Sequence, residues 1–255
     1  MPETMLMEKN NRTWICQLES YEKQNIKELK IQKVPAILRG VKSNKECYDP
    51  MIVAIGPYHH GKDELQQMET FKIQFTLQYA DQSGKSIRKL YEEMQNSLVE
   101  AKNYYTEDVA EKFNDEKFAE MLFLDSCFVI QFMDSCVNSE NNNIKTTNID
   151  TAFIRRDIML LENQLPLEIL TKLMCLSLRF EGGQGFEMID NFIKLIMKDP
   201  PIEEKAPRRK TCFLFFQTNS KSEETNRKKK KPIHLLELVR TKFVDDTKKK
   251  KKKTV

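Results

Sequence analysis

Apolar residues recur every three or four positions through the middle of the chain, which is the spacing of one face of an α-helix. Ser86 precedes one such stretch and can cap the start of a helix. The apolar positions that follow are Ile87, Leu90, Met94, Leu98, Ala101 and Tyr105. The spacing therefore predicts an amphipathic helix that begins directly after Ser86.

Further helices are predicted towards the C-terminus. Lys117 to Asp134, with Asn114 as its cap, is apolar on nearly every side and should lie at the centre of the core. Another helix is expected from about Thr151 to Glu162, and Pro166 suits the first turn of the next one. A last core helix is expected from Phe186 to Lys198. Its predicted core face consists of Phe186, Ile189, Phe192, Ile193 and Ile196.

Proline and glycine interrupt this pattern near the N-terminus. Pro35 restricts its neighbour Val34 to extended backbone. Residues 48–58 are punctuated by proline and glycine and are predicted to form a short buried extended segment between turns, whereas residues 135–148 form a polar loop. The chain has only 7 glycines but 15 phenylalanines and 12 methionines, which favours helix-packed cores over pleated sheets. We therefore predict a mainly α, irregular bundle-like domain.

Changes in composition divide the chain into four parts. Residues 1–27 are a polar N-terminal extension, and residues 28–202 form the helical domain. Residues 203–244 are a charged linker with a continuation of that domain, and residues 245–255 are a disordered lysine-rich tail. The tail contains six consecutive lysines, Lys248 to Lys253, which repel one another and must be solvated.

Positive charge is concentrated at the C-terminus. Residues 203–255 carry 18 Lys/Arg against 7 Asp/Glu, although the formal net charge of the chain is only +4. We expect weak contact of Lys248–Lys253 with an anionic membrane surface. The alternative is a nuclear or nucleic-acid-associated protein that uses Arg227–Pro232 and the terminal lysines. No specific nucleic-acid binding is expected, because few aromatic residues interleave with the lysines.

Metal and cofactor sites are not expected. The six cysteines lack paired spacing and most lie in apolar stretches, so we interpret them as small buried thiols in a reduced compartment. His59 and His60 are adjacent on an extended segment and would point to opposite faces, so they cannot share one metal ion without a sharp turn. We expect a turn with one histidine hydrogen-bonded to backbone; the alternative is a metal or catalytic site.

Asp125 is the most informative single residue, because it lies within the most apolar predicted helix. A carboxylate in that position must be paired or protonated, since an isolated buried charge is very costly. We expect it to pair with Arg155 or Arg156 and tie the two central helices together. The alternative, a catalytic acid with a raised pKa, has no nucleophile or oxyanion donor beside it in the sequence.

Glu162, Asn163 and Gln164 lie where one predicted helix ends and the next begins. Their side chains can satisfy the free backbone groups at helix ends, and the alternative is a binding site. None of the Walker-type loop, GxSxG, HExxH or GxGxxG motifs occurs in the sequence. We therefore expect no enzyme.

Several motifs in this order resemble the plant domain-of-unknown-function 247 family, also called uncharacterised protein family 0481. The resemblance covers about residues 28 to 240. The matching residues are Ile31–Arg39 (with Pro35), Tyr48 and Pro50, Ile55–Gly61 (with Gly56, Pro57, Tyr58, His59 and His60), Leu65, Met68, Glu69, Lys72, Asp125–Phe128, Asp157–Pro166 and His234–Arg240. Ser126 stands where the family usually has glycine.

The resemblance implies a plant protein without established activity or catalytic residues, associated with the plasma membrane when complete. Family members continue past the His234–Arg240 segment to a membrane-spanning helix, so this chain resembles a truncated member. Some relatives are implicated in pollen self-incompatibility, which is consistent with a role in recognising a partner. We therefore expect a non-enzymatic interaction or signalling protein with an unknown protein partner. For the truncated chain, which has no such helix of its own, the expected location is the cytosol, and the alternative is the nucleus.

Overall fold

The computed structural model describes residues 30–41, 44, 47–138, 147–198 and 231–252. Within these ranges the regular structure is helical and no strand forms, which confirms the mainly α prediction. The helices are α2 (Ala36–Arg39), α3 (Gln66–Ser83), α4 (Ile87–Glu100), α5 (Glu107–Ala110), α6 (Asp115–Val137), α7 (Asn148–Ile158), α8 (Leu167–Leu176), α9 (Gln184–Lys198) and α10 (Leu235–Lys252). Short 3-10 helices are η2 (Asp63–Leu65), η3 (Ala101–Tyr104) and η5 (Leu178–Gly183).

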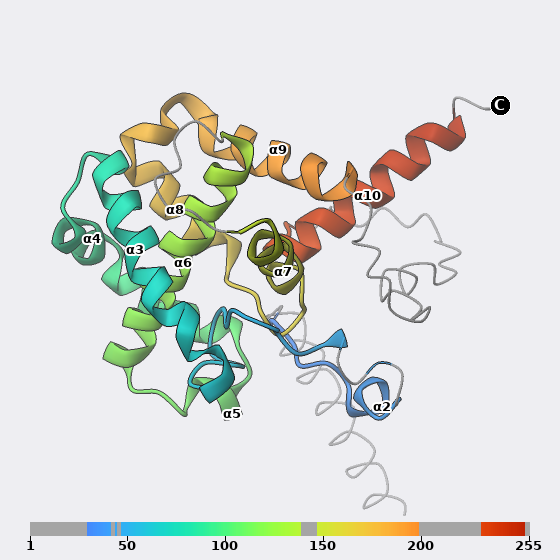
Figure 1. Ribbon diagram of the computed structural model, residues 1–255, viewed down its shortest axis with the longest axis horizontal. Coiled ribbons are helices and arrows are strands. Elements are labelled where there is room, and N and C mark those ends of the chain that lie inside the picture. Colours follow the sequence, from blue (N-terminus) through green and yellow to red (C-terminus); the bar gives the residue numbers. More distant parts are fainter. Residues whose placement is uncertain (1–29, 42–43, 45–46, 139–146, 199–230, 253–255) are drawn as a thin grey trace, which may run out of the picture. The chain divides into compact units, whose positions relative to one another are not determined.

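Helix α6 forms the centre of the core, as its sequence predicted. It packs against α3, α4, α8 and α9 (Figure 1). Its buried residues run almost without a break from Phe118 to Asp134, so it is surrounded by other elements along most of its length. A helix that is apolar on nearly every side is stable only in such a central position.

Two predicted helix caps are confirmed. The side chain of Ser86 accepts a hydrogen bond from the Lys89 backbone N–H, and that of Asn114 accepts one from Lys117. Helix α6 starts two residues before the predicted Lys117 and continues to Val137, into the segment that we expected to be a loop. Residues 139–146 of that segment lie outside the described residues.

Helix α7 ends earlier than predicted, at Ile158 instead of Glu162. Thr147 and Asp150 form a capping box at its start. At its end, the last carbonyl groups accept hydrogen bonds from side chains of residues 163 and 164, so the helix is closed without a further turn. Pro166 then caps α8 and lies one residue before its first turn.

The core face of α9 differs from the prediction at one position. Ile189, Phe192 and Ile193 are buried as expected, but Phe186 is 62% exposed. The inward position of the first turn is Gly185, where an added Cβ would lie 3.1 Å from Met174 Sδ. Because successive residues are about 100° apart around a helix, Phe186 points away from the core.

Helix α10 continues to Lys252, where the sequence predicted a disordered tail from residue 245. Lysine is a good helix former, and positive charge is favourable at a helix C-terminus, so a lysine run can extend a helix that already exists. The predicted linker falls largely in residues 199–230, outside the described ranges, as does the N-terminal extension. Among the described helices, none combines the length and the apolar character needed to cross a bilayer.

Candidate functional site

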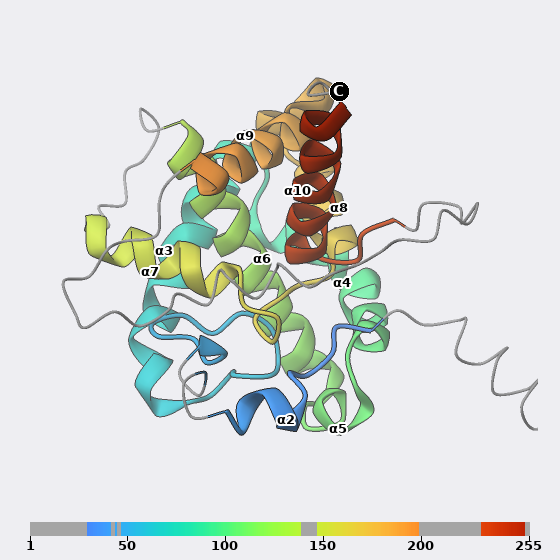
Figure 2. The ribbon, with the colours of Figure 1, turned by 90° about the vertical axis from the view of Figure 1, so that its right-hand side faces the viewer.

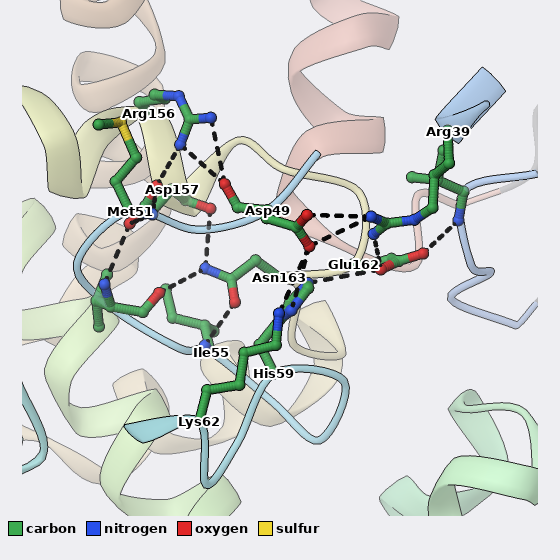
Figure 3. A network of polar contacts seen from close by, with 12 residues as sticks. Arg39, Asp49, Met51, Ile55, His59, Lys62, Arg156, Asp157, Glu162 and Asn163 are labelled. Atoms are coloured by element: carbon green, nitrogen blue, oxygen red, sulfur yellow. Dashed lines mark hydrogen bonds and ion pairs between the residues drawn. The ribbon is translucent and has the colours of Figure 1, made fainter. Parts of the chain in front are cut away.

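Residues 53–56 are buried and belong to no strand among the described residues, which agrees with the burial that the sequence predicted for the segment 48–58. One end is held by Asp157, the second-last residue of α7. Its carboxylate accepts hydrogen bonds from the backbone N–H groups of Met51, Ile52 and Val53, at 2.9–3.1 Å (Figure 3). One side chain thus supplies acceptors for three successive donors.

Asn163 and Asp125 complete this arrangement. The Asn163 amide donates to the carbonyl of Val53 and accepts from the N–H of Ile55, at 3.0 and 2.6 Å (Figure 3). Asp125 accepts from the N–H of Gly56 at 2.7 Å. Buried backbone groups must be paired, and here side chains do what a neighbouring strand does in a sheet. We call Asp125, Asp157 and Asn163 the backbone clamp.

Gly56 has a positive φ of 71° and leaves no room for a side chain. An added Cβ would lie 2.9 Å from the Gln164 carbonyl oxygen and 3.1 Å from the Tyr105 hydroxyl. The tight turn leads through Pro57 to Tyr58, whose hydroxyl donates to the carbonyl of Ile31. Glycine at this position is therefore required by both backbone conformation and space.

Asp125 is buried, as predicted, but its partner is not Arg155 or Arg156. Its Oδ1 lies 2.5 Å from Nζ of Lys72 on α3, and Arg156 instead pairs with Asp157 at 2.7 Å. Burial raises the pKa of Asp125, and Lys72 opposes that shift. Burial alone would lower the pKa of Lys72, but Asp125 and Glu69 outweigh it, so Lys72 stays charged. The pair joins α3 to α6.

Glu162 fixes the N-terminal segment to the domain. Its Oε1 accepts from the Val34 backbone N–H at 2.6 Å, and its Oε2 lies 2.5 Å from Nη2 of Arg39 (Figure 3). Pro35, between these two contacts, has extended backbone and caps the short helix α2. Glu162 therefore holds residues 34–39 at two points, and does not cap the helices on either side of it as we expected.

His59 lies within a charged cluster formed with Arg39, Asp49, Lys62 and Glu162 (Figure 3). Its ring nitrogens lie 3.8 Å from an oxygen of Asp49 and 3.5 Å from one of Glu162. Burial lowers the pKa of His59 to about 4, despite the two carboxylates. The imidazole is therefore neutral near pH 7.

The turn predicted at the histidine pair is present, at residues 57–61, but three of the four ring nitrogens do not bond to backbone. Within the described part of the chain, neither ring nitrogen of His59 has a hydrogen-bond partner, and the same holds for Nδ1 of His60. His60 instead packs edge-on against Phe113, with ring centroids 5.7 Å apart. The described residues also contain no group of three His, Cys, Asp or Glu that could hold a metal ion.

Gln164 connects the C-terminus of α7 to the N-terminus of α10. The contact with the end of α7 agrees with the capping role that the sequence predicted. Its amide donates to the carbonyls of Ile158 and Leu160, at 2.6 and 2.7 Å, and so caps the C-terminus of α7. Its Oε1 accepts from the N–H of Leu236, at the N-terminus of α10. The C-terminal helix is thereby attached to the same connection that carries Glu162 and Asn163.

A family model for plant proteins of unknown function, DUF247, matches residues 31–255. The chain belongs to this family. It is 29% identical to the putative UPF0481 protein At3g02645 of Arabidopsis thaliana over 62% of this chain and 29% of that protein. It is also 26% identical to UPF0481 protein At3g47200 of Arabidopsis thaliana over 80% of this chain and 39% of that protein. The chain spans less than half of these relatives, and no solved structure matches it significantly.

The residues that carried the DUF247 resemblance converge in the structure. Five of the polar ones, Asp125, Asp157, Glu162, Asn163 and Gln164, form the backbone clamp, the Glu162 contacts and the Gln164 link. Sequence reasoning missed the roles of Arg39, Asp49, Lys62 and Lys72. Lys72 carried a usable signal, because it lies between Met68 and Phe75 on the buried face of α3, where a lysine requires a buried partner.

The cysteines match their interpretation only in part. Cys127 is a buried free thiol, and burial raises its pKa well above the usual range. Cys175 is free but exposed, and Cys47 is disulfide-bonded. The expectation of small buried thiols therefore holds for Cys127 and not for Cys47 or Cys175.

Proposed function

We propose that this DUF247 chain is a non-enzymatic interaction module that recognises a protein partner through the outer face of α3. The observation that carries the proposal is the exposure of Ile73 and Leu77, at 51% and 53%, one turn apart on that face. The opposite face of α3 carries Phe75 and Tyr79 into the core. A helix that is apolar on both faces is normally covered on both.

The apolar surface extends past the end of α3. Leu178, on η5, is largely exposed and lies directly over Gly84, where an added Cβ would be 2.7 Å from its Cδ1. Ile73 and Leu77 share one face of α3 by their spacing, and Gly84 is the residue that caps the C-terminus of the helix. Exposed apolar side chains grouped in this way are typical of protein–protein contact sites.

The polar groups support a structural rather than a catalytic role. Asp125, Asp157 and Glu162 each accept from backbone N–H groups and also face a cationic side chain. The cavity beside Asn163 and Gln164 encloses about 10 Å³, which is room for at most one water molecule. Carboxylates occupied in this way are not available to a substrate.

Proximity labelling in plant cells tests the proposal. The double variant Ile73→Asp/Leu77→Asp should lose the neighbours that the parent chain labels, while its circular dichroism and thermal midpoint stay unchanged. Ile37→Asp is the matched control, since Ile37 is 81% exposed on a different helix, α2. An unchanged set of neighbours for the double variant, or an equal loss for the control, would overturn the proposal.

A further inference from the structure

The N-terminus of helix α10 is capped by a histidine. Nδ1 of His234, the residue directly before the helix, accepts a hydrogen bond from the backbone N–H of Glu237 at 3.2 Å. Oε2 of Glu237 in turn accepts from the backbone N–H of Ile233 at 2.8 Å. This arrangement resembles a capping box, in which a serine or threonine hydroxyl normally occupies the place of the imidazole. The acceptor at the start of α10 is therefore the unprotonated nitrogen of a titratable ring.

The same residues attach α10 to the domain. The carbonyl of Ile233 accepts from the N–H of Leu167, the first residue of α8, at 2.7 Å. His234 itself forms an isolated antiparallel bridge with Pro166, in the α7–α8 connection of residues 159–166. Figure 2 shows α10 as the red helix, with this anchored first turn at its lower end. The cap and the attachment thus depend on one short segment.

The first turn of α10 adds two further contacts. The N–H of Leu236 donates to Oε1 of Gln164 at 3.0 Å, and the buried side chain of Leu235 lines the small cavity beside Gln164. Further along the helix, Lys242 forms an ion pair with Asp190 on α9. Because a helix of this kind is held mainly at one end, a change at that end affects the whole attachment.

Protonation of His234 would remove the cap. The residue is 7% exposed, and burial lowers the pKa of its imidazole although Glu237 opposes that shift. The ring is therefore neutral at pH 7. A proton on Nδ1 would convert the acceptor into a donor that faces another donor, the N–H of Glu237. It would also place a positive charge at the N-terminus of a helix, where the helix dipole is already positive.

Few charges are available to stabilise a protonated His234. Residues 163–167, which contain its bridge partner, are uncharged. Glu162 and Glu168, on either side of that stretch, are paired with basic side chains. Glu237 acts on the imidazole from α10, but its carboxylate already accepts from a backbone N–H. The surroundings of His234 therefore favour the neutral ring.

We propose that His234 is an acid-sensitive switch: α10 stays attached to the α7–α8 connection while the imidazole is neutral, and detaches when Nδ1 takes up a proton. Detachment leaves the N–H of Leu167 without its acceptor and withdraws Leu235 from the cavity. The switch acts at the start of α10 and does not depend on the outer face of α3.

The direction of the effect follows from the two states of the imidazole. In the detached segment the ring has its ordinary pKa of about 6.5, whereas the attached ring binds a proton less readily. Attachment is therefore at full strength above about pH 6.5 and weakens as the pH falls below that value. At pH 5.5 the equilibrium between detached and attached helix should shift towards detachment by up to about ten-fold relative to pH 7.5.

Hydrogen–deuterium exchange of the full chain at pH 7.5 and pH 5.5 tests the switch, after correction for the intrinsic pH dependence of amide exchange. The amides of residues 237–242 should exchange about three- to ten-fold faster at pH 5.5, while those of α6 keep their protection. His234→Asn retains an acceptor at the helix start but does not titrate, so its α10 amides should show no such increase. His234→Ser is a second cap that does not titrate and should behave in the same way.

His59→Gln is the matched control, because it removes a buried imidazole elsewhere in the domain and should leave the increase in α10 unchanged. Equal exchange of the parent's α10 at both pH values would overturn the proposal. The same increase in both His234 variants would do so too, since the proton would then act at another group. An equal loss of protection in α6 would show that acid unfolds the whole domain, which also rules out a local switch.

Discussion

Lys72 and Asp125 form an ion pair in the middle of the core, where their side chains are 0% and 1% exposed. The pair connects α3 to α6, and Asp125 also accepts the Gly56 N–H, so three segments meet at one carboxylate. Removal of either partner leaves an uncompensated buried charge, which costs much more than the pair contributes when intact.

Asp125→Ala should therefore lower the free energy of unfolding by about 3–5 kcal/mol in urea denaturation. Lys72→Met should cost a similar amount, while the double variant Lys72→Met/Asp125→Ala should cost less than the two single changes together. The exposed pair Lys85–Glu93 is the control, and its disruption should cost below about 1 kcal/mol. Strict additivity of the two core changes would contradict the proposed coupling.

Asn163 must be an amide, because it donates and accepts at the same time. Asn163→Asp keeps the acceptor for Ile55 but places a carboxylate against the carbonyls of Val53 and Asp157. The variant should lose at least about 2 kcal/mol of stability at pH 7. Part of the loss should be recovered near pH 4, where a protonated carboxyl can donate again. Asn163→Leu, which cannot titrate, should show no such recovery relative to the parent.

Stability should fall as the pH drops below about 6.5, in part because of His59. Burial lowers its pKa to about 4 in the folded chain, against about 6.5 in the unfolded chain, so the unfolded state binds the proton first. The stabilisation that the neutral His59 gives to the folded state is complete above about pH 6.5 and is lost as the pH falls towards 4. At most, this loss lowers the free energy of unfolding by about 3 kcal/mol. Denaturation midpoints measured from pH 7 to 4 should fall less steeply for His59→Gln. Parallel curves for variant and parent would show that His59 does not titrate in this way.

Ser126 is a site where a single substitution should stabilise the domain. Its hydroxyl is buried in α6 and has no hydrogen-bond partner among the described residues. Ser126→Ala removes that unpaired group and should raise the free energy of unfolding by about 1 kcal/mol. Ser126→Gly should be close to the parent, because glycine in a helix costs about 1 kcal/mol relative to alanine.

Ser135 on the same helix is the control for this prediction. Its hydroxyl donates to the carbonyl of Gln131 at 2.8 Å, so Ser135→Ala should not stabilise the domain. Thermal melting of Ser126→Ala, Ser126→Gly and Ser135→Ala beside the parent would rank their stabilities directly. If both alanine variants stabilised equally, helix propensity and not the unpaired hydroxyl would be the cause.

The local features of this fold could be predicted from sequence, because their causes lie within a few residues. Ser86 and Asn114 cap helices through residues three positions later. The burial of Asp125 followed from its apolar neighbours on α6. Its partner did not, because Lys72 lies on another helix and periodicity contains no information about which helices touch. The contacts of His59 could not be predicted for the same reason, because Asp49 and Glu162 lie on other segments of the chain.

Features at the ends of elements were predicted less well for a related reason. The end of α7 is decided by the amides of Asn163 and Gln164, which compete with a further helical turn. The exposure of Phe186 is decided by the close packing of Gly185 on Met174. In both places a contact between separate segments determined the outcome, and the apolar pattern of one segment contains no information about such a contact.

The backbone clamp has a consequence for how the chain folds during its synthesis. Met51 is separated from Asp157 by 106 positions, and Val34 from Glu162 by 128. At about 5–20 residues per second, the ribosome needs about 5–20 s after making residues 51–53 before it supplies the carboxylate that holds them. Until then their N–H groups must remain hydrated, so the N-terminal segment can take its place only after α7 has emerged. Residues 34 and 51–53 are therefore made early but reach their final positions only after α7 has formed.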